Sequence, residues 1–108
     1  MEKKNELLDL TYTFSLKIIV YCELLDKSRK FAISNQLIRS GTSIGANVRE
    51  AQNVHSRKDF IARLIISAKE ADESEYWLML CRDSPEYPDT NELINDVHII
   101  KKILSKII

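Results

Sequence analysis

The sequence predicts an all-α fold, an antiparallel up-down-up-down four-helix bundle. The 108 residues include only two glycines and two prolines, whereas a sandwich or barrel of short strands needs turn residues about every 8 to 12 positions. Apolar residues recur at alternating steps of three and four, which places them on one face of a helix. The length suits one hydrophobic core, so we expect residues 1–108 to form a single domain.

Two helices are expected in the first half of the chain. The first spans about residues 5–26, with the apolar stripe Leu7, Thr11, Phe14, Ile18, Tyr21 and Leu25. A short connection at residues 26–28 leads to the second helix. This helix spans about residues 29–54, with the stripe Ile33, Leu37, Ser40, Ile44, Val48 and Ala51.

Two more helices are expected in the second half. Ser56 and Asp59 form a capping-box-like start for the third helix, whose expected stripe is Ile61, Leu64, Ala68, Ala71, Glu75 and Leu78. This helix ends near Arg82, because residues 83–89 contain both prolines and residues before proline avoid the helical region. The fourth helix begins behind a cap at Asp89 or Thr90, reaches nearly to the carboxyl terminus, and carries the stripe Leu93, Val97, Ile100, Leu104 and Ile107. Four such helices with short loops bury their stripes most simply in a bundle.

The apolar runs of the chain indicate no association with a membrane. None approaches the roughly 20 residues that span a bilayer, and the amino terminus lacks the apolar core of a signal peptide. We therefore expect a cytoplasmic protein. In a reducing compartment Cys22 and Cys81 are expected to be buried thiols, although parallel helices would place them near one end of the bundle, where a disulfide under oxidising conditions is the alternative.

The residues that could support catalysis do not form a recognisable set. A ferritin-like dimetal site needs Glu three residues before His, and neither His55 nor His98 has it. The paired spacings of a zinc site and a glycine-rich phosphate loop are also lacking. We predict no catalytic residue, no metal and no cofactor, and interpret both histidines as surface residues. The sequence favours a binding module over an enzyme.

The second predicted helix contains an unusual cluster of small residues, namely Ser40, Gly41, Ser43, Gly45 and Ala46. Each mid-helix glycine costs about 1 kcal/mol relative to alanine, and small residues four apart let another helix approach closely. We interpret the cluster as a close helix-packing surface. The alternative is a site where the backbone of a ligand approaches.

Two polar residues, Asn47 and Glu75, fall on or beside the predicted apolar stripes. A buried polar group without a partner costs about 1 to 3 kcal/mol. We therefore expect these two side chains to be hydrogen-bonded, to Ser43 or to each other. Such a buried polar network would fix the register of the helices rather than perform catalysis.

Three segments resemble a known family. They are QLIRSGTSIGANVREA at residues 36–51, SRKDFI at residues 56–61 and EADESEYWL at residues 70–78. Together they resemble the four-helix-bundle proteins encoded in 23S ribosomal RNA intervening sequences. The resemblance implies a bacterial protein that assembles into a ring, commonly a homopentamer, without established enzymatic activity. A related branch accompanies the reverse transcriptase of diversity-generating retroelements, binds nucleic acid and is strongly basic, whereas this chain has 16 basic and 16 acidic residues.

The chain contains more apolar residues than one core can easily bury. In the first helix these are Leu8, Leu10, Tyr12, Leu16, Ile19, Val20 and Leu24, and in the fourth they are Ile94, Ile99, Ile103 and Ile108. Such exposed apolar area usually marks an interaction site, which predicts a homo-oligomer. The alternative is a wide core stripe with a few ordinary exposed apolar residues.

The neutral total charge hides a strong asymmetry. Residues 27–63 contain eight Lys or Arg and two Asp or Glu, while residues 70–92 contain one and eight. In the bundle, six basic residues would gather at the end that holds both termini, together with Lys3 and Lys4. The six are Arg57, Lys58, Arg63, Lys101, Lys102 and Lys106.

This basic end leaves two function classes open. Several Lys and Arg side chains bind the phosphates of RNA or DNA without reading bases, which would make the protein a nucleic-acid-associated module. Acidic residues also lie near that end, so the charges can instead form an ordinary surface of ion pairs. The chain would then be an assembly scaffold that binds a partner protein through its apolar or acidic surfaces.

Overall fold

A computed structural model describes the backbone of residues 2–108 and the side chains of residues 6–108. It contains the helices α1 (Glu2–Lys27), α2 (Phe31–Ala51), α3 (Arg57–Asp83) and α4 (Asn91–Ile107). The prediction of an all-α four-helix bundle is confirmed, and residues 2–108 contain no strand. The molecule is a rod of 45 × 20 × 18 Å. No helix among the described residues is both long and apolar enough to cross a bilayer.

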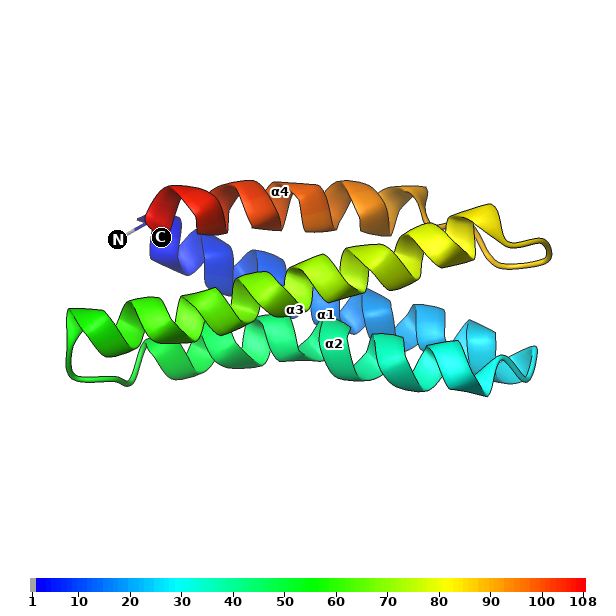
Figure 1. Cartoon of the computed structure of the whole chain (residues 1–108), viewed down its shortest axis with the longest axis horizontal. Helices are drawn as coiled ribbons and strands as arrows, with labels where there is room; N and C mark the ends of the chain where they lie inside the picture. The colour runs from blue at the N-terminus through cyan, green and yellow to red at the C-terminus, as the bar shows by residue number, and fades with distance from the viewer. Residues whose placement is uncertain (1) are drawn as a thin grey trace.

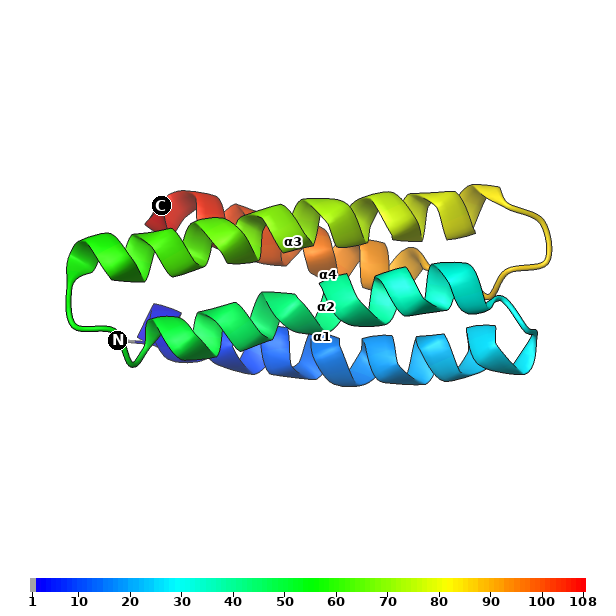
Figure 2. The ribbon, with the colours of Figure 1, turned by 60° about the horizontal axis from the view of Figure 1, so that its bottom comes forward.

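The helices lie side by side along the rod, and each runs back beside the one before it (Figures 1 and 2). Within the described residues, α1 contacts α2, α2 contacts α3, α3 contacts α4 and α4 contacts α1, whereas the diagonal pairs do not meet. The helices therefore occupy the four corners of a roughly square cross-section, with α1 and α3 at opposite corners. Figure 1 shows the start of α1 and the end of α4 at one end of the rod, and the α1–α2 and α3–α4 connections at the other.

The core consists of stripes with alternating steps of three and four, the spacing of bundle helices that supercoil around each other. The predicted stripe of α1 is buried throughout, and those of α2 and α4 differ only in Ile33 and Ile107, which are half-buried. In α3 the predicted positions Leu64, Ala71 and Leu78 are buried, whereas the other three predicted positions, Ile61, Ala68 and Glu75, are each replaced in the core by the residue before them. The buried residues of α3 are Phe60, Leu64, Ser67, Ala71, Ser74, Leu78 and Cys81.

Buried hydroxyl groups explain why Ser67 and Ser74 replace two of the predicted α3 core positions. The Ser67 Oγ donates a hydrogen bond to the Ile44 carbonyl at 2.9 Å, and the Ser74 Oγ donates to the Ser40 Oγ at 2.9 Å. These bonds satisfy polar groups that would otherwise be costly to bury, and serine occupies little space between α2 and α3. The small serines therefore lie inside, while the more apolar Ile61 and Ala68 are only half-buried.

Local chemistry sets the helix ends. Arg29 has a φ of 61°, so α2 begins at Phe31 and not at residue 29 as predicted. The Ser56 Oγ accepts the Asp59 amide proton at 3.1 Å, as a capping start requires. At α4 the capping residue is Thr90, whose side chain makes no capping bond.

Two glycines of the small-residue cluster lie against α1. A Cβ added at Gly41 would come within 2.9 Å of the Cγ1 and Cγ2 atoms of Ile18, and one added at Gly45 within 3.1 Å of the Thr11 carbonyl oxygen. Ser40 is buried against α3 through its bond to Ser74. This geometry supports the packing interpretation.

Cys22 and Cys81 are both buried and both free thiols. Burial raises the pKa of Cys22 to about 11 and also raises the pKa of Cys81. Because the thiolate is the reactive form, both side chains behave at neutral pH as small hydrophobic residues.

Replacing Gly41 by alanine is expected to lower the free energy of unfolding by about 1 kcal/mol. The new methyl removes a helix-propensity cost of about 1 kcal/mol but overpacks Ile18, at a cost of about 1 to 3 kcal/mol. Urea unfolding followed by circular dichroism at fixed protein concentration measures the change. Combining Gly41→Ala with Ile18→Val should cost less than the sum of the two single changes, and Ser43→Ala on the same helix should change stability by less than about 0.5 kcal/mol. A more stable Gly41→Ala variant would contradict the close contact.

Candidate interaction surface

The outer face of α1 carries a row of exposed apolar side chains, which we call the α1 ridge. The exposed fractions are 66% for Tyr12, 48% for Leu16, 39% for Ile19, 57% for Val20 and 43% for Leu24. The core stripe uses the opposite face of the helix, so the bundle has no place for these side chains. Leu8 and Leu10, which the sequence also marked as surplus, pack partly against the core.

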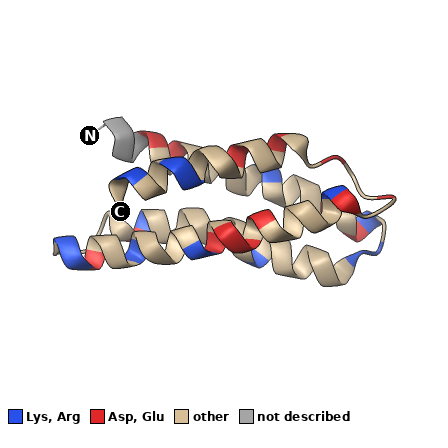
Figure 3. Cartoon of the chain, turned by 45° about the horizontal axis from the view of Figure 1, so that its top comes forward, with Lys and Arg blue, Asp and Glu red and all other residues tan. Residues whose placement is uncertain are grey.

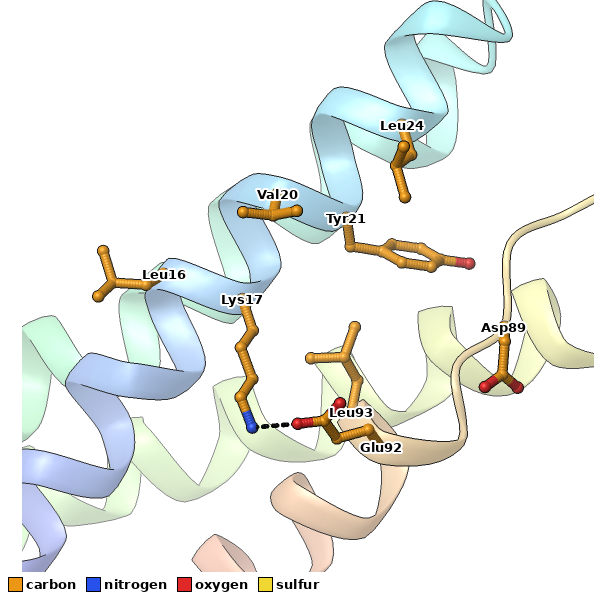
Figure 4. A pocket seen from close by; sticks show the side chains of 8 residues that line it. All are labelled: Leu16, Lys17, Val20, Tyr21, Leu24, Asp89, Glu92 and Leu93. Carbon is orange, nitrogen blue, oxygen red and sulfur yellow. Dashed lines mark hydrogen bonds and ion pairs between the residues drawn. The ribbon is translucent and has the colours of Figure 1, made fainter.

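A groove of about 390 Å³ separates the α1 ridge from α4 (Figure 4). Its lining residues are Leu16, Lys17, Val20, Tyr21, Leu24, Asp89, Glu92 and Leu93. The Tyr21 hydroxyl donates to the Pro88 carbonyl at 2.8 Å, and burial raises the pKa of Tyr21 so that it stays a donor. Lys17 spans the groove to Glu92 at 2.6 Å and reaches Asp96 at 2.9 Å. This α1/α4 groove has an apolar floor and an acidic rim.

A second groove, of about 670 Å³, lies on the other side of the ridge, between α1 and α2. Tyr12, Leu16 and Ile19 line it from α1, and Thr42, Gly45 and Ala46 line it from α2. Because these three α2 residues are small, this part of the groove stays open, and Arg49 is a further α2 residue that lines it. Leu16 lines both grooves and is therefore the crest of the ridge. The small-residue cluster thus contributes to this α1/α2 groove as well as to helix packing.

The predicted basic residues lie in two places, at the start of α3 and along the last turns of α4 (Figure 3). Arg63 is engaged with Glu50 at 3.0 Å. Lys101 is engaged with Asp72 at 2.6 Å and with Glu75 at 2.7 Å. The other four, Arg57, Lys58, Lys102 and Lys106, are exposed and have no ion pair among the described residues. The side chains of Lys3 and Lys4 lie outside the described residues.

Asn47 and Glu75 are both hydrogen-bonded, as expected, and Asn47 bonds to Ser43. The expected shared network is wrong, because both residues are half-buried and they bond separately. Asn47 donates to the Ser43 carbonyl at 2.9 Å and accepts from Arg63 at 3.3 Å. Glu75 accepts a hydrogen bond from Lys101 at 2.7 Å. Ser74 occupies the core position expected for Glu75, which places Glu75 at the edge that faces α4.

Glu75 is the centre of a charged cluster between α3 and α4. Lys101 lowers the pKa of the Glu75 carboxyl, and His98, which also pairs with it, lowers it further. His98 is exposed on α4, as expected, and its pairing with Glu75 adds a role that the sequence did not predict. His55 is exposed at the α2–α3 connection, as expected.

The outer face of α3 has exposed apolar residues that were not predicted from the sequence. They are Ile65, Ile66, Tyr76, Met79 and Leu80, with exposed fractions between 37% and 55%. Their position outside the predicted apolar stripe of the third helix could have indicated that these residues are exposed. Because α1 and α3 occupy opposite corners of the bundle, these residues and the α1 ridge lie on opposite sides of the rod.

Glu75→Gln is expected to destabilise the protein at neutral pH but not in acid. A folded-state pKa below the unfolded value of about 4.3 contributes stability above that value, which is lost as the pH falls through the lower folded pKa. Urea unfolding at several pH values between 7 and 3 measures the difference between wild type and variant, which should shrink as the pH falls. Glu86→Gln, at an exposed site without an ion pair among the described residues, should show no such trend. An unchanged difference across the range would argue against a stabilising Glu75–Lys101 pair.

Comparisons with known proteins extend over nearly the whole chain. The model of the family described as 23S rRNA-intervening sequence protein matches residues 3–106. A crystal structure of a protein with unknown function from the S23 ribosomal protein family of Bacteroides thetaiotaomicron is similar to this chain with 41% sequence identity and a TM-score of 0.90. The similarity covers 97% of this chain and 96% of that one. No curated protein matches this sequence.

Proposed function

Because this chain belongs to the 23S rRNA-intervening sequence protein family, we propose that it is a non-catalytic binding module that assembles with copies of itself. The assembly is a ring, commonly of five subunits, as the family resemblance implies. Its second partner is RNA or DNA, which it meets through exposed basic side chains near the end of the rod that holds the termini.

The observation that carries the assembly proposal is the α1 ridge. Tyr12 and Val20 expose more than half of their surface, and Leu16, between them, exposes 48%. Surfaces of monomers rarely present a contiguous apolar row of this kind, and such rows usually mark protein–protein contacts. Burying apolar side chains contributes about 25 cal/mol for each Å² removed from water. Self-association is the simplest way to bury the ridge.

Support for nucleic-acid binding comes from the four basic residues that have no ion pair among the described residues, of which Arg57 lies over the Phe60 ring. Arg57 and Lys58 begin α3, and Lys102 and Lys106 lie in the last turns of α4. A ring repeats these charges in every subunit, so that several contacts with one phosphate backbone can form together. Binding of this kind is insensitive to base sequence and weakens steeply with salt.

The second candidate function is a scaffold that binds another protein without nucleic acid. The outer face of α3 favours it, because Ile65, Tyr76 and Leu80 are exposed there. Acidic side chains lie beside this face, and Asp72 is one of them. A partner protein with an apolar surface would fit this region, and its binding would weaken less steeply with salt than contacts with phosphates do.

Leu16→Glu is expected to dissociate the assembly, because it places a charge on the crest of the α1 ridge. Light scattering should show the wild-type mass as a multiple of the 12.5 kDa chain at both low and high salt, and the variant near one chain. Tyr76→Glu, the same kind of change on the opposite corner, is the matched control and should keep the wild-type mass. Circular dichroism checks that both variants are folded. A monomeric wild type would refute self-assembly, and a multimeric Leu16→Glu variant would refute the role of the ridge.

The double variant Arg57→Ala/Lys58→Ala is expected to weaken binding to a single-stranded RNA oligonucleotide by a similar factor for every sequence. The slope of log affinity against log salt should become shallower by about 1 or more, as phosphate contacts are lost. Fluorescence anisotropy at several salt concentrations measures both quantities. Lys27→Ala/Lys69→Ala removes the same charge from exposed sites elsewhere and should change binding less. A wild-type protein that binds no RNA or DNA even at low salt would favour the scaffold function.

A further inference from the structure

We infer that neighbouring copies meet head to tail, with the α1/α4 groove of one copy receiving the α1/α2 side of the next. In this contact Phe31 of the second copy is seated in the groove of the first. The inference rests on the proposed self-assembly and names the two surfaces that meet.

The positions of the two grooves determine the symmetry of this contact. They lie on adjacent sides of a square bundle and share the α1 corner, so they face directions about 90° apart. In a closed ring built from one head-to-tail contact, the two contacting sides of a copy face directions about 90° apart for four copies, about 108° for five and about 120° for six. The grooves therefore suit a small closed ring in which α1 lines the inside.

Phe31 is the side chain that we expect to contribute most to the contact. It is 51% exposed at the first position of α2. Ile38, Thr42, Gly45 and Arg49 follow Phe31 along α2 at steps of seven, four, three and four residues. This helical spacing puts Phe31 on the same face of α2 as those residues, the face that borders the α1/α2 groove. A large aromatic side chain on such a face is the kind of residue that dominates binding energy when it enters a pocket of a partner.

Phe31 and its proposed receptor lie at the same height along the rod. Phe31 follows the α1–α2 connection, and Leu24 and Asp89 line the α1/α4 groove close to that connection and the α3–α4 connection. Figure 1 shows both connections at one end of the molecule. Subunits of a cyclic ring all lie at one height along the ring axis. The Phe31 side chain of one copy is therefore level with this part of its neighbour's groove.

Charges favour the same contact. Arg29, two residues before Phe31, is exposed and has no ion pair among the described residues. On the rim of the groove, Glu92 is bound to Lys17, whereas Asp89 accepts only a backbone hydrogen bond from Asn91. The contact brings Arg29 of one copy towards Asp89 of the next, which gives the free acid a cationic partner.

The same charges disfavour a two-fold contact between α1 ridges. The exposed acidic residues of α1 with described side chains lie near its two ends, with Glu6 and Asp9 at one and Glu23 and Asp26 at the other, where Lys27 offsets one of the two negative charges. An antiparallel pair would bring the first set against the second, and a parallel pair would bring each set against itself. Like charges facing each other oppose association.

Disulfide trapping tests the contact. Leu24→Cys, in the part of the α1/α4 groove that lies level with Phe31, and Phe31→Cys are prepared as separate variants, mixed in urea, refolded together and mildly oxidised. We expect a covalent dimer from the mixture and none from either variant alone, because the head-to-tail contact brings position 31 of one copy to position 24 of its neighbour. The native thiols are buried, so the wild type is the control for background. A mixture of Leu24→Cys with Tyr76→Cys, on the opposite corner, should also give no dimer.

The possible results distinguish the head-to-tail contact from self-assembly itself. A dimer from Leu24→Cys alone would replace the head-to-tail contact by a two-fold one. No dimer from the mixture, while light scattering shows that both variants keep the wild-type multimeric mass, would overturn the contact but leave self-assembly intact. A wild-type protein that is monomeric by light scattering would overturn self-assembly and this contact together.

Discussion

The close approach of α1 and α2 at Gly41 and Gly45 is the contact on which the other features of the molecule depend. A methyl group at Gly41 would overlap Ile18, and one at Gly45 would make a tight contact with the Thr11 backbone, so the two glycines allow the helices to lie this near. The same lack of side chains leaves the α1/α2 groove open on the outside. The helix-propensity cost of the two glycines is thus offset by the close packing of α1 against α2. On the outer side of the bundle, the missing side chain of Gly45 contributes to the α1/α2 groove.

The four helices are joined by two kinds of polar contact. Buried hydroxyls join α2 to both of its neighbours, since Ser34 donates to the Cys22 carbonyl of α1 and Ser74 donates to Ser40. In contrast, α4 is tied by partly exposed ion pairs, from Lys17 on one side and to Glu75 on the other. Pairs of this kind contribute about 0 to 1 kcal/mol and weaken in salt. The apolar stripe of α4 therefore provides most of its attachment.

The sequence was sufficient to predict the helices, because their apolar stripes repeat with a constant period and glycine and proline are rare. It failed where burial depends on a partner in another helix. Ser67 and Ser74 are buried because α2 accepts or shares their hydrogen bonds, and no local pattern reports that partner. For the same reason the surplus of apolar residues on α1 was predictable from one helix alone, whereas the pairing of Lys101 with Asp72 and Glu75 was not.

The turn between α1 and α2 also has a kinetic consequence. Only residues 28–30 separate the two helices, and the Lys30 amide bonds back to the Leu25 carbonyl at 2.9 Å. Closing so short a loop costs little entropy, and contacts between neighbouring segments form faster than contacts between distant ones. The α1–α2 hairpin is therefore the part of the chain best suited to form first. During synthesis it leaves the ribosome before α3 and α4, so the helix that carries the apolar ridge is already paired on one side while the rest of the bundle is still being made.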